Sequence, residues 1–203
     1  LNFLSKDWFV DQHFLTRGRF GRSLVAMQTY DFPYGVGIDE DTALLIEGGS
    51  KARVLGYRGV LLMNAKGASR SPDEQRFHWK NVQLSYLSHG DMFDMNTLEI
   101  KPGPEKRPED KVDPNIKDFK PYYLLKQFYN DIFANTQLLD LMYKLVDGPH
   151  SEAIGLAFDG EEAKKGDTPG FEFRFYRKGD SVSWDSPIAL GDSNTVLNVY
   201  LDI

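Results

Sequence analysis

The apolar and polar positions of the first hundred residues follow the pattern of short β-strands separated by turns. Short apolar runs recur between glycines and charged residues, as expected for strands that contribute to a common core. A helix is predicted between the first two strands, with Thr16 as its N-cap and its end before Pro33. One face of this helix holds Phe20, Leu24, Val25 and Gln28. The predicted strands are residues 8–10, 35–38, 42–46, 53–55, 60–63, 82–87 and 92–100.

The second hundred residues begin with a break in this pattern. Residues 101–121 hold five prolines and many charges, so we interpret them as an exposed linker or loop. Residues 122–146 show the strongest helical periodicity of the chain, with a candidate break at Asn135 and Thr136. Further strands are predicted at 154–158, 171–176 and 196–201. The two predicted helical stripes are Leu125, Phe128, Tyr129, Ile132 and Phe133, and then Leu138, Leu141, Met142 and Leu145.

Composition narrows the class of protein. Of 203 residues, 41% are hydrophobic and 27% are charged, which is typical of a soluble globular protein, and no apolar run reaches the ~20 residues that a membrane helix needs. The net charge of −6 argues against a nucleic-acid partner. The absence of cysteine excludes disulfides, a cysteine nucleophile and thiolate zinc sites, but leaves the compartment open.

Two polar segments carry the candidate chemistry. The first, residues 11–22, contains one histidine and three arginines, and the second, residues 37–41, contains three consecutive acids before an apolar run. A histidine can act as a general base near neutral pH when a carboxylate fixes its tautomer. Glu40, or its neighbours Asp39 and Asp41, can supply that carboxylate to His13, while the arginines offer forked donors for a substrate carboxylate.

Simpler interpretations of the same residues stay open at this point. A histidine after a strand is often structural, an arginine-rich helix face is usually solvated, and residues 37–41 fit a plain turn that lacks the spacing of a calcium loop. We interpret His78 and His150 as surface loop residues and His89 as part of a turn. Since no two histidines have the short spacing of a metal site, we expect neither a metal nor another cofactor.

The two polar segments together resemble the family of cyanophycinase and related serine peptidases. The resemblance rests on DQHF at residues 11–14, RGRFGR at 17–22 and GVGIDEDTA at 35–43, in matching order and separation. It covers roughly residues 1–56. It implies an α/β three-layer fold like that of class I glutamine amidotransferases, with a flavodoxin-like sheet. It also implies that His13 is the general base and that Glu40 orients it. The substrate-binding positions implied by the family are Asp11, Gln12, Arg17, Arg19 and Arg22.

One part of the family pattern is absent from the chain. The family's nucleophile is a serine in a Gly-x-Ser-Ala-Gly turn upstream of the DQH motif, and no Gly-x-Ser-x-Gly occurs in these residues. We interpret Gly48-Gly49-Ser50 as a hairpin turn. The chain also begins at Leu1, without an initiator methionine. We therefore expect a C-terminal part of a longer protein, inactive alone, whose serine comes from an upstream part and whose localisation stays open.

These observations give a set of expectations. We predict residues 1–58 as the C-terminal part of the catalytic α/β domain, 59–100 as a β-rich continuation, 101–121 as the linker and 122–203 as an α+β C-terminal extension. The intact protein is expected to release β-aspartyl-arginine dipeptides from an aspartate–arginine polymer or peptide. The alternatives are an aspartyl dipeptidase of the same superfamily and a non-catalytic binding protein that has lost the serine. Expected partners are the substrate, the missing N-terminal part and a second copy in a homodimer, with no nucleic acid and no membrane.

Overall fold

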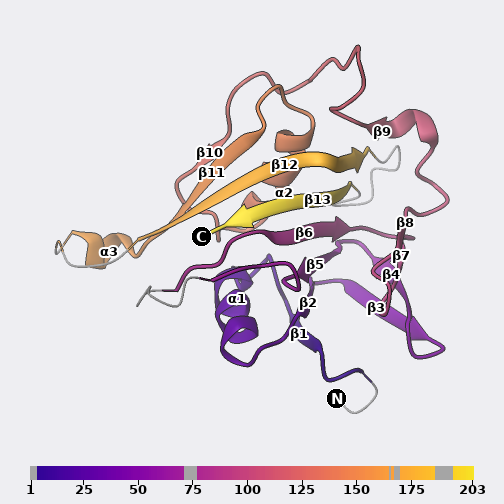
Figure 1. Cartoon of the computed structure of the whole chain (residues 1–203), viewed down its shortest axis with the longest axis horizontal. Coiled ribbons are helices and arrows are strands. Elements are labelled where there is room, and N and C mark those ends of the chain that lie inside the picture. The colour runs from indigo at the N-terminus through magenta and orange to yellow at the C-terminus, as the bar shows by residue number, and fades with distance from the viewer. Residues whose placement is uncertain (1–3, 71–76, 165, 167–169, 186–193) are drawn as a thin grey trace.

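A mixed β-sheet runs through the whole molecule (Figure 1). The computed structural model describes residues 4–70, 77–164, 166, 170–185 and 194–203. Nine of the described strands form one sheet in the order β1-β2-β5-β6-β13-β12-β11-β10, with β9 paired to β12. Their bounds are β1 Trp8–Gln12, β2 Tyr34–Ile38, β5 Val60–Asn64, β6 Val82–Leu87, β9 Lys111–Val112, β10 Phe128–Tyr129, β11 Glu152–Ala157, β12 Phe171–Trp184 and β13 Thr195–Asp202. The β1–β2 and β10–β11 pairs are parallel, and the other pairs are antiparallel.

A second, antiparallel sheet of four strands lies against one face of the first. It has the order β3-β4-β7-β8. The bounds are β3 Thr42–Glu47, β4 Lys51–Gly56, β7 Met92–Asp94 and β8 Ile100–Lys101. The predicted strand over residues 92–100 is therefore two short strands joined by a turn. The other predicted strands are all present, most with slightly different ends, but β12 continues to Trp184, well beyond the predicted end at residue 176.

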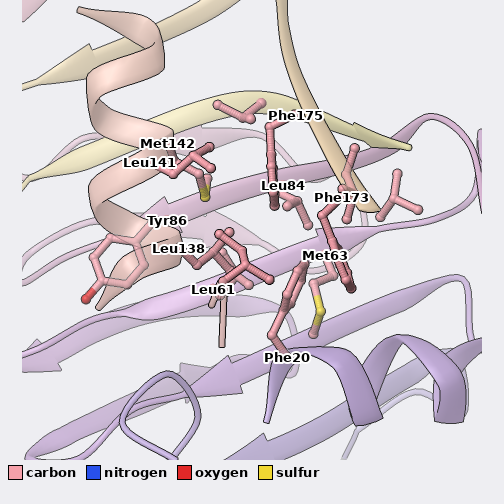
Figure 2. Close-up of a cluster of buried hydrophobic side chains, with 14 of the residues drawn as sticks. Phe20, Leu61, Met63, Leu84, Tyr86, Leu138, Leu141, Met142, Phe173 and Phe175 are labelled. Carbon is pink, nitrogen blue, oxygen red and sulfur yellow. The ribbon is translucent and has the colours of Figure 1, made fainter. Parts of the chain in front are cut away.

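The helices cover the face of the large sheet that lies opposite the small sheet. Their bounds are α1 Phe20–Thr29, α2 Gln137–Val146 and α3 Gly160–Ala163, with a 3₁₀ turn, η1, at Pro108–Asp110. Side chains of α1 and α2 pack with one face of β5, β6 and β12 in one apolar cluster, and Figure 2 shows Phe20, Leu138 and Phe173 within it. The opposite face packs against the small sheet. Among the described residues, no helix combines the length and apolar composition needed to cross a bilayer.

Strand β5 shows why the sequence favours this layering. Leu61 and Met63 belong to the cluster beneath the helices, whereas Val60 and Leu62 belong to the cluster beneath the small sheet. A strand covered on both faces needs apolar residues at every position rather than at alternate ones. The result is an α/β mixed sheet with few helices, compatible with the predicted flavodoxin-like fold. The predicted division after residue 58 does not interrupt the sheet, since β2 pairs with β5 across it.

The prediction of helix across residues 122–146 is wrong in its first half. Helix α2 begins at Gln137, and the second predicted stripe is its buried face. Upstream, Phe128 and Tyr129 form β10, and Leu125 and Phe128 are 81% and 61% exposed. Apolar residues spaced by three and four also fit a strand between loops, so periodicity alone did not separate the two structures.

The start of α1 also differs from the prediction. Thr16 does not cap the helix, which begins at Phe20 after Arg19. Gly18 has a φ of +59°, which interrupts helical geometry, and the Thr16 hydroxyl donates a hydrogen bond to Asp39 instead. Val25, predicted on the packed face, is 46% exposed. The helix does end before Pro33, as predicted.

Residues 101–121 are largely irregular, but they are not simply an exposed linker. Their first part is fastened to a buried carboxylate, Asp91, whose Oδ1 accepts hydrogen bonds from the Gly103 N–H at 2.7 Å and from Lys106 Nζ at 2.5 Å. The Asp91 and Lys106 side chains are 0% and 3% exposed. Further along, β9 pairs with β12 of the large sheet. The segment is thus attached to the rest of the fold at two places, near its start and at β9.

Candidate active site

A strand–helix–strand unit positions the candidate site. Strands β1 and β2 are parallel neighbours, with Gln12 opposite Ile38, and α1 lies between them in sequence. Because parallel strands run in the same direction, their carboxyl ends lie at the same edge of the sheet. His13 directly follows β1, and Glu40 follows β2 by two residues. The two polar segments therefore meet where open α/β sheets commonly bind ligands.

The packing of Phe14 against β2 sets the position of His13. Phe14 is 0% exposed, and a Cβ on Gly37 would lie 2.2 Å from its ring, so this contact requires glycine. The backbone turns at His13, whose φ is +50°. A non-glycine residue in this left-handed region costs about 1–3 kcal/mol and persists where the surrounding structure imposes it. Strain of this kind is common at functional sites.

The His13 imidazole contacts the Glu40 carboxylate. Nδ1 of His13 lies 3.2 Å from Oε1 of Glu40, and the two side chains are 46% and 33% exposed. Nε of Arg17 lies 3.4 Å from the same Oε1. With Nδ1 facing the carboxylate, Nε2 is the ring nitrogen that can accept a proton from a hydroxyl nucleophile. An imidazole held in this way by a carboxylate can act as a general base.

The buried carboxylate of Asp39 joins the two polar segments. Its Oδ1 accepts hydrogen bonds from the Thr16 hydroxyl at 2.7 Å, the Thr16 N–H at 3.3 Å and the Glu40 N–H at 2.9 Å. The guanidinium of Arg58 lies 3.9 Å from Oδ2. Asp39 is 5% exposed and is committed to these groups, so the carboxylate that reaches His13 is that of Glu40. Asp39 instead holds the loop after β1 against the loop after β2.

The Asp11 carboxylate binds two of the three arginines. Arg22 donates from Nε at 3.1 Å and from Nη2 at 2.7 Å to Oδ2, and Arg19 Nη1 donates to Oδ1 at 3.0 Å. The Ser23 hydroxyl and the Gln12 N–H complete the set of donors. The Asp11 side chain is 11% exposed. Asp11 and Arg19, both predicted as substrate-binding residues, are thus engaged in an internal ion-pair cluster.

The remaining predicted binding residues are more accessible. The Arg17 and Arg22 side chains are 55% and 59% exposed, but Arg22 is bound to Asp11 through Nε and Nη2. Gln12 is exposed, and within the described part of the chain its side-chain amide has no hydrogen-bond partner. Arg17 and Gln12 therefore have the geometry best suited to reach a substrate near His13.

Replacing Asp11 with Asn should reduce the acid sensitivity of the fold. Burial acts to raise the pKa of Asp11, but hydrogen bonds from Arg22, the Gln12 N–H and Arg19 outweigh it and hold this pKa below its usual value. The Asp11 carboxylate thus binds a proton less tightly in the folded chain than in the unfolded chain. The stabilisation is fully present above the unfolded pKa of about 4 and is lost as the pH falls through the lower folded value.

Urea unfolding at pH 7 and at pH 3.5 measures this effect. We expect Asp11→Asn to be less stable than the wild type at pH 7 but to lose less stability between the two values. The matched control is Asp31→Asn, because Asp31 is 82% exposed in its side chain and pairs only loosely with Arg70, at 3.5 Å. An Asp11→Asn variant whose stability falls with pH as steeply as that of the wild type would contradict a contribution of Asp11 to the acid sensitivity of the fold.

Comparison with known proteins finds similarity over about half of the chain. A cyanophycinase of Synechococcus elongatus is 32% identical over 100 residues, which are 47% of this chain and 31% of that protein. A cyanophycinase of Trichormus variabilis is 31% identical over 104 residues, which are 49% of this chain and 35% of that protein. The chain is similar to cyanophycinases. A third cyanophycinase, of Geminocystis herdmanii, is 31% identical over 99 residues, or 46% of this chain and 36% of that protein.

The extent of this cyanophycinase-like similarity is limited. The match covers about half of this chain and about a third of the length of each of these relatives. No family model matches the chain. The similarity supports a cyanophycinase-like hydrolase, while the catalytic residues and the whole protein's activity belong to the proposal below.

Sequence reasoning missed the positioning roles of three residues. The sequence predicts Asp39 only as a possible partner for His13 and Thr16 only as a helix cap, and it predicts no packing role for Phe14. The available signal was Gly37 in β2 together with an aromatic residue directly after His13, because a glycine in a buried strand often marks close approach of another group. The prediction that His78 is a surface residue is also wrong, since His78 is 8% exposed.

Proposed function

We propose that this chain is the C-terminal part of a cyanophycinase-like serine hydrolase that cleaves an aspartate–arginine polymer. His13 is the general base, Glu40 orients it, and the nucleophilic serine comes from an N-terminal part outside these residues. The observation that carries the proposal is the His13–Glu40 contact at the carboxyl ends of two parallel strands. The similarity to cyanophycinases over about half of the chain supports the substrate class.

The proposed reaction is acyl transfer. Nε2 of His13 takes the proton from the serine hydroxyl as the oxygen attacks the α-peptide carbonyl between two aspartates of the polymer backbone, and Glu40 stabilises the imidazolium that forms. His13 then gives the proton to the leaving amine of the polymer, and water, deprotonated by His13, releases the acyl group from the serine. The products are β-aspartyl-arginine dipeptides. Arg17 and Gln12 position the substrate, with Arg17 facing a substrate carboxylate through its forked guanidinium.

The test is an assay of dipeptide release by the full-length protein that contains this chain. Three measurements separate the candidate functions: cleavage of the aspartate–arginine polymer, cleavage of an N-terminal aspartyl dipeptide, and binding of the polymer without turnover. Release of β-aspartyl-arginine from the polymer supports the proposal. Preferential cleavage of the aspartyl dipeptide supports the aspartyl dipeptidase alternative, and binding without any cleavage supports a binding protein that has lost the serine.

Replacing Arg17 with Met should lower kcat/KM for the polymer by about 10- to 100-fold. A hydrogen bond to a charged group contributes about 1.5–3 kcal/mol, and Met keeps most of the length of the side chain while removing the donors. The control is Arg53→Met, since Arg53 is an exposed arginine on β4 of the small sheet. Steady-state kinetics that are equal for the two variants would contradict a role for Arg17 in substrate binding.

A further inference from the structure

A groove lined by tyrosines and aspartates lies at the C-terminal end of α2. Its volume is about 560 Å³, and every residue that lines it falls between Lys111 and Asp185. The candidate active site, by contrast, is built from residues 11–40. Three tyrosines and four aspartates line the groove against two lysines, one of which, Lys111, is paired with Asp113 at 3.2 Å. The groove therefore combines aromatic rings with an excess of negative charge.

The three tyrosines form a continuous aromatic wall. The rings of Tyr122 and Tyr123 meet edge to face with centroids 4.9 Å apart, and Tyr123 meets Tyr143 in the same way at 5.7 Å. The hydroxyl of Tyr143 donates a hydrogen bond to Asp185. Lys144 lies over the ring of Tyr123, 5.5 Å from its centroid, whereas Tyr122 is 79% exposed. A tyrosine face in this position attracts cations through the negative side of its π-system.

Asp147 supplies a buried carboxylate to the same groove. It is 7% exposed, and its Oδ1 accepts a hydrogen bond from the Tyr122 N–H at 3.2 Å. No hydrogen bond from the described residues reaches its Oδ2, and within that part of the chain neither Asp147 nor Asp185 has an ion-pair partner. Burial and the nearby charge of Asp185 raise the pKa of Asp147. A buried carboxylate without a cation is costly, so this group favours a positively charged ligand.

The helix itself adds to the negative potential. Asp147 is the C-cap of α2, a helix of ten residues. The C-terminal end of a helix carries about half a negative charge, which favours cations and disfavours a carboxylate. Helices normally avoid an acid at this position, and here the acid is also buried. The helix end, the Asp147 carboxylate and the tyrosine faces all favour the same kind of ligand.

We propose that this groove binds a guanidinium group, namely an arginine side chain of the aspartate–arginine polymer, at a site separate from the His13 site. The choice of polymer as the ligand rests on the proposed function. The choice of guanidinium rests on shape, because a planar guanidinium stacks on tyrosine and donates paired hydrogen bonds to a carboxylate, whereas an ammonium is a compact, strongly hydrated charge. The groove holds one arginine branch of the polymer while the backbone is cleaved at another residue of the same polymer.

Calorimetric titration of the chain with small probes tests the site without requiring hydrolysis. The probes are N-acetyl-arginine amide and its citrulline counterpart, which has nearly the same shape and no charge. We expect saturable binding of the arginine probe, at least tenfold tighter than that of the citrulline probe. Equal binding of the two probes, or no binding of the arginine probe, would overturn the proposal.

Three variants locate the binding. Asp147→Asn removes the buried charge, and Tyr122→Ala removes an exposed ring whose loss leaves the core intact. We expect each to weaken arginine binding at least fivefold. The control is Glu172→Gln, an exposed carboxylate on β12 outside the groove, which should bind as the wild type does. Unchanged affinity in Tyr122→Ala, in a folded protein, would show that the arginine binds elsewhere.

The outcome is independent of the active-site proposal. His13→Asn should bind the arginine probe with unchanged affinity, because His13 is not part of the groove. Arginine binding that depends on Asp147 and Tyr122, together with no cleavage of the polymer, would support the guanidinium site and contradict the proposed hydrolase function. Polymer cleavage without binding of the arginine probe would support the hydrolase function and contradict the guanidinium site.

Discussion

Replacing His13 with Asn is expected to lower kcat for cleavage of the aspartate–arginine polymer by about 10³- to 10⁴-fold. General-base catalysis contributes roughly 10²–10⁴-fold, and removal of a residue that acts as one unit with a nucleophile reaches the upper part of this range. Asn is preferred to Ala because His13 has a φ of +50°, a conformation that Asn tolerates better than most residues. Asn also lacks a group that accepts a proton near neutral pH.

The fold should survive this substitution. The His13 side chain is 46% exposed, and the buried contact in this turn is made by Phe14 rather than by His13. Circular dichroism and the midpoint of thermal unfolding provide the control for folding, and the kinetics are measured on the full-length protein. A folded His13→Asn variant with turnover within tenfold of the wild type would show that another group is the base.

The second large effect is expected at Asp91, away from the candidate site. Replacing Asp91 with Ala should lower the free energy of unfolding by about 3–5 kcal/mol, since this removes one partner of a buried ion pair and leaves Lys106 as an uncompensated charge. Asp91 also accepts hydrogen bonds from the Ser88 N–H at 2.9 Å and from the Thr195 hydroxyl at 2.5 Å. The substitution thus disconnects residues 101–106 from the junction of β6, β13 and the small sheet.

Urea unfolding at neutral pH measures the effect of Asp91→Ala. The control is Glu99→Gln, which breaks an ion pair of the same type on the surface, where Glu99 and Lys101 are 63% and 67% exposed. Exposed pairs contribute about 0–1 kcal/mol, so this variant should remain close to the wild type. If the two variants are equally stable, the Asp91–Lys106 pair does not hold the segment as the structure indicates.

The meeting of His13 and Glu40 could be predicted because it depends on topology and a short motif. Strand, helix and strand signals around residues 8–38 imply a parallel pair, and the residues after two such strands must share an edge. The positions of the apolar strands along the chain were also predictable, since burial on one or both faces leaves a pattern in the sequence. The small sheet against the opposite face was not predicted, because strand signals do not say which sheet a strand joins.

The pairing of charges within the site could not be predicted. Three arginines near a histidine look equivalent in sequence, but Arg19, directly before α1, and Arg22, in its first turn, bind Asp11, whereas Arg17 lies beside Glu40. Which carboxylate each guanidinium meets depends on the point at which the helix begins, and the prediction placed that point at Thr16. Gly18, with a φ of +59°, interrupts the helix after that point, and the Thr16 hydroxyl bonds to Asp39, 23 positions away, instead of capping it.

Long-range ¹H–¹⁵N NMR of the histidine rings tests the central claim most directly, because it reports the His13 tautomer in this chain without needing the serine. At a pH where the imidazole is neutral, we predict that His13 carries its proton on Nδ1, facing Glu40, with Nε2 unprotonated. In Glu40→Gln this preference should weaken, and the His13 signals should shift while those of His89 and His150 stay in place. A His13 ring protonated on Nε2 in the wild type, or one unaffected by Glu40→Gln, would contradict the account.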